Sequence, residues 1–251
     1  MKINLIAFII VASTIGCVQQ SKVEEAIPES DSSTVALSIW QNRYAPLIKS
    51  ALNKEMPLST TRDLQGAIAD LNKAIEIVPS DPWAFQIRAG IKKQLGDYRG
   101  AIIDYNMAIK LDTSNSSYYE YRGDVKLMQL KYKEASDDFT KSTQLDENNY
   151  TSYFKRGEVK SKNLNNYKGA IEDYSLAIEI CNNEVKQNPA DKDGNTPVGA
   201  VFARLEIRDY YLARGNSQLK IGDIDKACLD FSKAGELGEA SAYELIRMYC
   251  N

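Results

Sequence analysis

Aspartate recurs along the chain at regular intervals, and carboxylates are side chains that enzymes use as general acids and bases and that metal ions bind. The recurring positions are Asp70, Asp104, Asp138, Asp173 and Asp230, and arginine recurs in step with them at Arg88, Arg122, Arg156 and Arg214. Because the two series repeat together, structural ion pairs between packed elements explain the pattern better than a row of catalytic acids. We therefore expect Asp104 and Asp138 to lie within salt-bridge distance of a repeat arginine.

Histidine is absent from the 251 residues, and the four cysteines lack the spacing of a zinc site. The absence of imidazole excludes Ser-His-Asp and Cys-His nucleophile arrangements and every metal site that requires histidine. The segment Asp191-Lys192-Asp193-Gly194-Asn195 invites comparison with a calcium loop. Its glycine is fourth rather than sixth, however, and Phe202 stands where the glutamate at position twelve belongs. We expect a solvated turn there, no metal, no cofactor and no catalytic residue, so the chain is predicted not to be an enzyme.

The charge of the chain is close to balanced. It contains 31 Lys and Arg against 34 Asp and Glu, which gives a net charge of -3 and a pI of about 5.3. A nucleic-acid-binding protein needs a basic field to meet phosphates, and no dense basic run occurs here, so nucleic acid is not expected as a partner. With 43% hydrophobic and 26% charged residues, the composition is that of a folded globular protein.

One motif occurs five times: a small residue, an aromatic or leucine four positions later, and a second small residue three positions after that. Its first residues are Ala67, Ala101, Ala135, Ala170 and Ala227, so the first three intervals are 34, 34 and 35 residues and the last is 57. Positions i, i+4 and i+7 share one face of a helix, and a fixed period of this length is typical of a helical solenoid. Helices are expected near residues 64–78, 98–111, 132–145, 167–181 and 224–237, with an insertion at about 182–199.

A second helix precedes each of these and carries an aromatic residue, an arginine and then a small residue. It includes Phe85-Gln86-Ile87-Arg88-Ala89, Tyr119-Glu120-Tyr121-Arg122-Gly123, Tyr153-Phe154-Lys155-Arg156-Gly157 and Tyr211-Leu212-Ala213-Arg214-Gly215. Together with the period, these residues resemble the tetratricopeptide repeat over about residues 48 to 237. The resemblance implies an all-α, right-handed α-solenoid of helix-turn-helix repeats that serves as a non-enzymatic protein–protein interaction scaffold.

In tetratricopeptide arrays the first helices of successive repeats line a concave groove that binds a protein or peptide. By register, the resemblance implies that the groove of this chain contains Trp83, Gln86, Lys93, Glu120, Asp124, Phe154, Glu158, Leu212 and Asn216. Cytosolic co-chaperones of the family clamp a partner's C-terminal carboxylate with Lys, Asn and Arg. Gln86, Glu120 and Asp124 occupy matching positions here, so that subfamily is disfavoured.

The N-terminus has the features of an export signal. Lys2 precedes an apolar run of roughly ten residues, which is too short for a membrane-spanning helix, and small residues follow it. Thr14-Ile15-Gly16-Cys17 resembles the lipobox of bacterial lipoproteins, which implies a signal peptide over residues 1–16 and a lipid on Cys17. Residues 17–33 are polar and suit a tether, and the solenoid occupies residues 34–251. An ordinary cleaved signal is the alternative, since Thr14 stands where leucine is usual.

The C-terminus carries a predicted capping helix, residues 239–250, that would cover the exposed end of the stack. A turn near Gly238 would make this helix antiparallel to the preceding one and bring Cys228 opposite Cys250. A disulfide between them would stabilise the fold by about 3 kcal/mol, and two separately buried thiols are the alternative. The ending also resembles that of tetratricopeptide proteins from Bacteroidetes-type bacteria, which supports an exported origin. Cys181 is left over and is expected to be a small buried hydrophobe.

These resemblances favour a membrane-anchored protein of a bacterial cell envelope. We expect a lipoprotein that faces the periplasm, holds to the membrane through its lipid and binds a protein or peptide in its groove. The alternative is a soluble adaptor without a lipid, either exported to the periplasm or the medium or retained in the cytosol.

Overall fold

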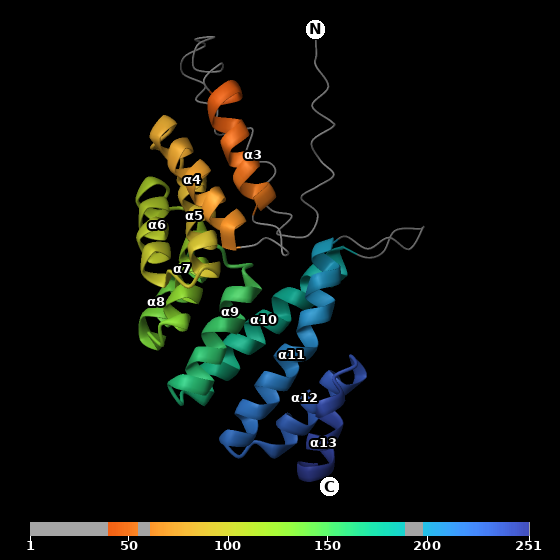
Figure 1. Cartoon of the computed structure of the whole chain (residues 1–251). Coiled ribbons are helices and arrows are strands. Elements are labelled where there is room, and N and C mark those ends of the chain that lie inside the picture. The colour runs from red at the N-terminus through yellow and green to blue at the C-terminus, as the bar shows by residue number, and fades with distance from the viewer. Residues whose placement is uncertain (1–39, 55–60, 189–197, 251) are drawn as a thin grey trace.

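The computed structural model describes residues 40–54, 61–188 and 198–250, and every regular element in these ranges is a helix. Five antiparallel helix pairs follow one another, and a single helix closes the C-terminal end (Figure 1). Each helix packs chiefly against its neighbours in the sequence, as in a repeat array. This architecture is the predicted all-α solenoid with a C-terminal capping helix.

We term the first helix of each pair the A helix and the second the B helix. The A helices are α3 (Ala45–Lys54), α5 (Pro82–Gln94), α7 (Ser116–Met128), α9 (Tyr150–Glu158) and α11 (Val198–Lys220). The B helices are α4 (Thr61–Ile77), α6 (Tyr98–Leu111), α8 (Tyr132–Leu145), α10 (Tyr167–Gln187) and α12 (Ile224–Glu236), and the cap is α13 (Ala240–Tyr249). One π-helical turn, η2 (Trp40–Tyr44), precedes α3 and another, η3 (Val159–Asn163), continues α9.

Polar caps and left-handed glycines set the ends of these helices. A side-chain oxygen before seven of them accepts a hydrogen bond from a backbone N–H of the first helical turn, and the capping residues are Asp81, Asp97, Asn115, Asn149, Asn166, Asp223 and Glu239. Gly96 and Gly222, with φ of 79° and 83°, lie in the turns from A to B, where other residues are strained. The chain therefore reverses direction within a few residues between α5 and α6 and between α11 and α12.

The core is a ladder of small residues against aromatic rings, as the repeat motif predicts. The first alanine of the motif is fully buried in all five copies. A methyl group added to Gly123 would come within 2.8 Å of Phe139, and one on Gly215 would come within 2.7 Å of Phe231. Glycine therefore permits the close approach of these A helices to the rings of their own B helices.

The repeat arginines and aspartates form ion pairs, which confirms the prediction for Asp104 and Asp138. In four pairs, Nε and Nη2 of the A-helix arginine donate to the two carboxylate oxygens of the B-helix aspartate at 2.6–3.0 Å: Arg88 to Asp104, Arg122 to Asp138, Arg156 to Asp173 and Arg214 to Asp230. A lysine one turn later contacts the same carboxylate in three of them, namely Lys92, Lys126 and Lys160. The aspartate side chains are at most 6% exposed, so they support packing and do not face a substrate.

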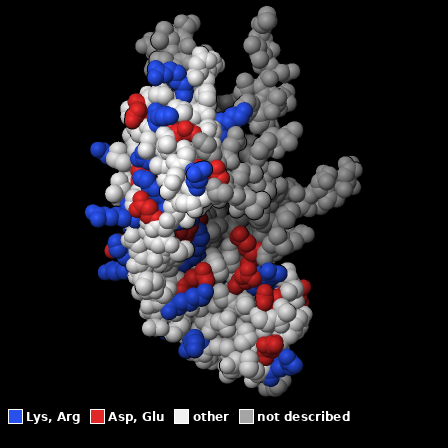
Figure 2. Space-filling view, viewed as in Figure 1, with Lys and Arg blue, Asp and Glu red and all other residues white. Residues whose placement is uncertain are grey.

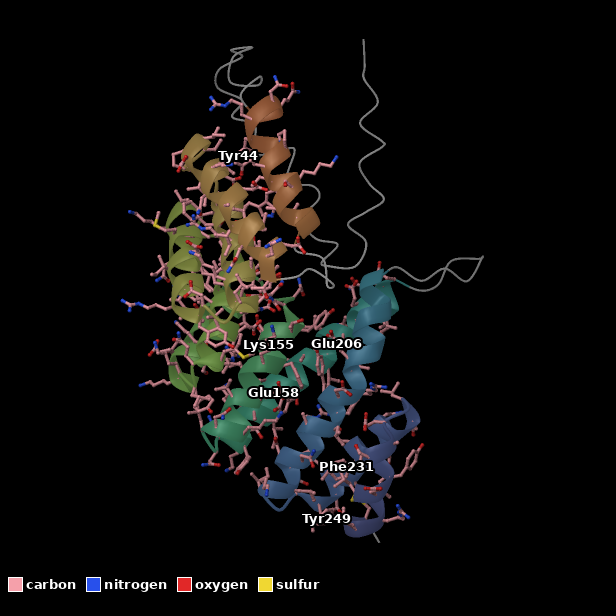
Figure 3. The ribbon with its side chains drawn as sticks, in the orientation of Figure 1. Tyr44, Lys155, Glu158, Glu206, Phe231 and Tyr249 are labelled. Carbon is pink, nitrogen blue, oxygen red and sulfur yellow. A yellow bond between two sulfur atoms is a disulfide. The ribbon has the colours of Figure 1, made fainter. Side chains whose placement is uncertain are left out.

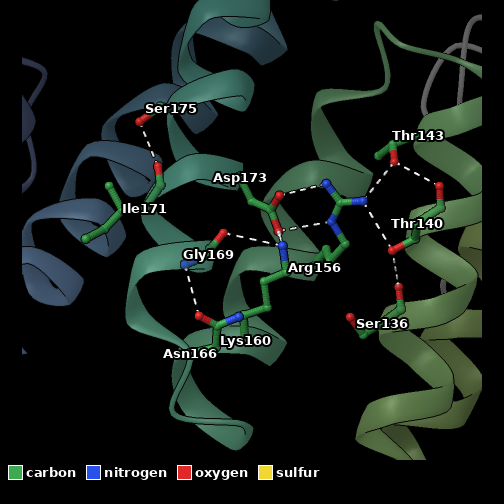
Figure 4. Close-up of polar contacts among 10 residues, drawn as sticks. All are labelled: Ser136, Thr140, Thr143, Arg156, Lys160, Asn166, Gly169, Ile171, Asp173 and Ser175. Carbon is green, nitrogen blue, oxygen red and sulfur yellow. Dashed lines mark hydrogen bonds and ion pairs between the residues drawn. The ribbon is translucent and has the colours of Figure 1, made fainter.

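Each of these arginines also reaches the preceding repeat. Its Nη1 donates at 2.6–3.2 Å to the B helix of the pair before: Arg88 to Asn72, Arg122 to Asn106, Arg156 to Thr140 and Thr143, and Arg214 to Ser175. Its guanidinium carbon lies 5.3–5.5 Å from the centre of an aromatic ring one turn earlier on its own helix. One side chain thus joins three helices from two repeats, as Figure 4 shows for Arg156.

Two parts of the stack depart from the expected pattern. In the last pair, Gln218 stands where lysine follows the arginine elsewhere, and its buried Oε1 has no hydrogen-bond partner. The predicted end of the fourth B helix at residue 181 is wrong, because α10 continues through Gln187 into the expected insertion. Val185 on this extension packs against the core between α10 and α11, and that contact explains why the helix continues.

The cap helix α13 covers the end of the stack. Ala242 is buried against Phe231 of α12, and Leu245 and Ile246 pack on the same core. Cys228 and Cys250 join α12 to the end of α13 as a disulfide, with Cα atoms 5.7 Å apart. The bridge in cells stays a prediction.

The predicted signal peptide (1–16), Cys17, the tether (17–33) and the calcium-like segment (191–195) lie outside the described residues. Among the helices that the structure does describe, none is long and apolar enough to cross a membrane. Export and lipidation therefore stay predictions from the sequence.

Asp138→Asn is expected to destabilise the fold by about 3 kcal/mol, because it leaves Arg122 and Lys126 without their shared counter-charge in a buried site. Asp137→Asn removes the same charge from the exposed side of α8 and is the matched control, with an expected change below about 0.5 kcal/mol. Urea denaturation measures the free energy of unfolding of both variants. Equal losses would show that the ion pair does not support the fold.

Candidate functional site

The candidate site consists of side chains on the concave side of the A helices in the C-terminal half of the chain. Figure 3 labels Lys155 and Glu158 on α9 and Glu206 on α11, and a stacked pair of aromatic rings joins the two helices. Figure 2 shows charged side chains of both signs on this face of the molecule. Because arginine contacts hold both helices, the stack fixes the positions of these side chains.

Lys155 is the centre of a charged cluster between α7 and α9. Its ammonium group donates to Glu120 and to Asp124, both at 2.9 Å. Asn149, the N-cap residue of α9, donates to the second carboxylate oxygen of Glu120, also at 2.9 Å. Lys93 of α5 adds positive charge near Asp124. The cluster therefore links the concave sides of three successive A helices.

Burial and charge act in opposite directions on this cluster. Burial disfavours the charged form of Lys155, but Glu120 and Asp124 outweigh burial and raise the pKa of the ammonium group to about 12. Burial raises the pKa of Asp124, and Lys155 opposes that change. The lysine is thus charged at physiological pH, and its charge offsets the repulsion between two neighbouring carboxylates.

Phe154 forms an aromatic cluster with α10 and α11 beside the charged one. Its ring stacks on Tyr210 with centroids 4.3 Å apart, and the ring of Tyr174 lies 5.5 Å away on its other flank. Tyr210 donates to Glu206 at 2.7 Å, and the ring of Tyr150 lies 6.4 Å from that of Tyr210. Burial, followed by the charge of Glu206, raises the pKa of Tyr150 to about 12. Glu206 therefore places a negative charge beside these aromatic rings.

The structure brings together four of the nine residues predicted to line the groove. Lys93, Glu120 and Asp124 meet in the charged cluster. Phe154 forms the aromatic cluster and adjoins Lys155 in the sequence. These four residues belong to the three successive A helices α5, α7 and α9.

The other five are dispersed. Trp83 packs against the core of the first pair, and Leu212 packs against the core below the cap. Glu158 pairs with Lys162 of η3, Asn216 is exposed, and the buried Oε1 of Gln86 has no hydrogen-bond partner. Glu158 lies near Lys155 on α9 (Figure 3), whereas the other four positions do not form one surface with the two clusters.

Sequence reasoning missed Lys155, Glu206 and Tyr210. The predicted register followed one line of positions along each A helix, whereas the exposed face of a helix is wide enough to include a neighbouring position. Lys155 directly follows Phe154, so a wider face would have included it. Glu206 and Tyr210 lie in the middle of α11, whose length the insertion obscured.

The described residues offer no group of three or more acidic or cysteine side chains arranged to hold a metal ion. Cys181 is buried in α10, and burial, followed by the charges of Glu206 and Glu184, raises the pKa of its thiol to about 12. A thiol with that pKa is protonated at neutral pH and is a poor nucleophile.

Comparison with known proteins agrees with this architecture. A family model described as a tetratricopeptide repeat matches residues 150–184, which include α9 and most of α10. A crystal structure of the MamA protein is 21% identical over 81% of this chain and 96% of that chain, with a TM-score of 0.61. The chain has the tetratricopeptide repeat fold.

Two further solved structures resemble most of the chain. MamA from residue 41 to the end, from Desulfovibrio magneticus RS-1, is 18% identical over 77% of this chain and 92% of that chain, with a TM-score of 0.58. YrrB, described as a TPR protein with an unusual peptide-binding site, is 17% identical over 86% of this chain and 98% of that chain, with a TM-score of 0.57. Identities this low establish the fold alone. No curated protein sequence matches the chain.

Lys155→Met is expected to destabilise the tetratricopeptide stack by about 3 kcal/mol near neutral pH, because Glu120 and Asp124 are left close together and unpaired. The penalty should shrink as the pH falls, since protonation of Asp124, whose pKa burial raises, removes the repulsion. Urea denaturation of the variant and the wild type at neutral and mildly acidic pH measures both effects. Lys162→Met, which removes the positive charge of an exposed lysine in η3, is the control. A pH-independent loss, or one matched by the control, would contradict this role of Lys155.

Proposed function

We propose that the chain is a non-enzymatic scaffold of the bacterial cell envelope that binds a protein or peptide in its concave groove. The observation that carries the proposal is the cluster of Lys155, Glu120 and Asp124, which fixes charged groups from neighbouring A helices beside an aromatic cluster. Fixed polar and aromatic side chains on rigid helices suit peptide recognition, because little ordering is needed on binding. The peptide-binding site ascribed to YrrB, which shares the fold, supports the same use of the groove here.

The groove favours a segment that carries basic and apolar side chains. Glu206 accepts a hydrogen bond from Tyr210, and Glu184 accepts one from Asn188, but neither forms a salt bridge with a basic side chain among the described residues. A lysine or arginine of a bound segment would supply the missing counter-charge. Tyr150 and Phe154, both half-buried, would contact its apolar stem.

The proposal includes attachment to the membrane through a lipid on Cys17, with the polar tether between the lipid and the solenoid. The lipobox-like residues Thr14-Ile15-Gly16-Cys17 and the apolar run before them support it. More than one acyl chain is needed for stable attachment, and a mature bacterial lipoprotein carries two or three. An anchored groove would hold its partner at a high local concentration beside the membrane.

A photoreactive residue tests the groove. With p-benzoylphenylalanine in place of Glu158, on the groove side of α9, ultraviolet irradiation of intact cells is expected to trap a partner protein. The same residue in place of Glu172, on the exposed side of α10, is the control and should trap none. Equal products from both positions, or none from position 158, would overturn binding in the groove.

Palmitate labelling of the same cells tests the anchor. The wild type is expected to incorporate the label and to sediment with membranes, whereas Cys17→Ser should lose the label and be released. An unlabelled wild-type protein in the soluble fraction would favour the soluble adaptor instead. The two measurements are independent, so groove binding can survive the loss of the anchor.

A further inference from the structure

The two edges of the stack differ in charge. Because every pair is antiparallel and successive pairs stack in one orientation, the described turns within pairs lie on one edge and the described connections between pairs lie on the other. Figure 1 shows the α9–α10 and α11–α12 turns along the lower margin. Lys and Arg exceed Asp and Glu in and around the turns within pairs. The described connections between pairs contain no basic residue and carry Asp81, Asp112, Asp146, Glu147 and Glu239.

Exposed cations mark the first of these edges. We define the basic rim as residues 128–133, 162–168 and 220–224, which form three successive turns within pairs. Four of its lysines are exposed and form no salt bridge with a described residue: Lys131, Lys133, Lys168 and Lys220. Their charge is therefore available to an external anion.

Exposed apolar side chains lie among these lysines. Leu130 is 69% exposed and Met128 is 59% exposed at the α7–α8 turn. The next two turns present Leu164, Ile221 and Ile224, which are also exposed. At the described connections of the opposite edge, Leu111 and Leu237 are the exposed large apolar residues, and both are less exposed than any of these five. Each turn of the basic rim thus combines a protruding apolar side chain with lysine.

The α7–α8 turn keeps these residues at a cost to local stability. Leu130 has φ of 60°, in the left-handed region that Gly96 and Gly222 occupy at equivalent turns. Lys131 precedes α8 and makes no side-chain capping hydrogen bond, whereas aspartate caps the equivalent helices α6 and α12. Glycine and aspartate would suit the turn better. A role outside the fold accounts for an exposed leucine and lysine there.

We propose that the basic rim docks on the surface of a negatively charged lipid bilayer. Lysines near such a surface are attracted to anionic headgroups, and apolar side chains between them insert at the boundary with the acyl chains. The apolar residues stand on separate turns and do not form one continuous patch. This spacing suits a planar, fluid surface better than a shaped protein pocket. The acidic opposite edge would face away from the membrane.

Vesicle sedimentation tests the docking without the proposed lipid anchor. The probe is the chain from residue 18 onward, which retains every described helix, with vesicles of phosphatidylcholine alone or mixed with phosphatidylglycerol. Binding is expected only to the mixed vesicles and should weaken with added salt. Lys133→Gln and Lys168→Gln should each weaken it about fivefold, as expected for one lysine near an anionic surface.

Leu130→Gly separates docking from folding. It should raise the midpoint of urea denaturation, since glycine relieves the left-handed strain, and yet weaken vesicle binding. Lys141→Gln and Leu229→Ala alter exposed residues of α8 and α12 outside the basic rim and should bind like the wild type.

Binding to neutral vesicles as tight as to anionic ones, no vesicle binding at all, or losses shared by the control variants would overturn the proposal. A protein trapped by a photoreactive residue at position 130 in cells, without vesicle binding in vitro, would assign the basic rim to a protein partner instead. None of these outcomes bears on lipidation of Cys17 or on the groove.

Discussion

Each of the four repeat arginines holds three helices in a fixed relation, and the rest of the stack depends on this contact. A guanidinium directs its N–H donors in one rigid plane. Two of them meet the aspartate of the same repeat, and another crosses to the repeat before. A buried ion pair gives little net stability over apolar packing, but breaking one is costly. The contact therefore acts chiefly to select one register of helix against helix.

The groove follows from this register. Since each arginine fixes its A helix on the side away from the groove, the concave side chains of neighbouring A helices approach in one arrangement, in which Lys155 meets Glu120 and Asp124. In the last pair the arginine contact remains, but Gln218 stands in place of the second cation. There the cap helix α13 and the link from Cys228 to Cys250 also constrain α12. Rigid packing thus extends from the second pair to the C-terminal end.

The sequence predicts the parts of the structure that repeat. The alanine ladder, the pairing of Asp104 and Asp138 with arginine, and the opposition of Cys228 to Cys250 all follow from spacing, because helix geometry is periodic. Contacts that occur once do not follow from it. Lys155 contacts α7 only because of the angle between two repeats. Helix α10 is longer than the repeat period predicts because Val185 packs in the core that α10 shares with α11. The hydrogen bonds that each arginine donates to the preceding repeat, for example to Asn106 or Thr140, cannot be predicted from spacing, because they depend on how the repeats stack.

The repeat arginines couple neighbouring repeats, and native-state hydrogen exchange of Arg156→Lys tests this coupling most directly. Lysine keeps a positive charge beside Asp173 but lacks the planar group that also reaches Thr140 and Thr143 of α8. We predict faster exchange of amides in α8 as well as in α9 and α10. Unchanged protection of α8, with losses confined to α9 and α10, would contradict the account.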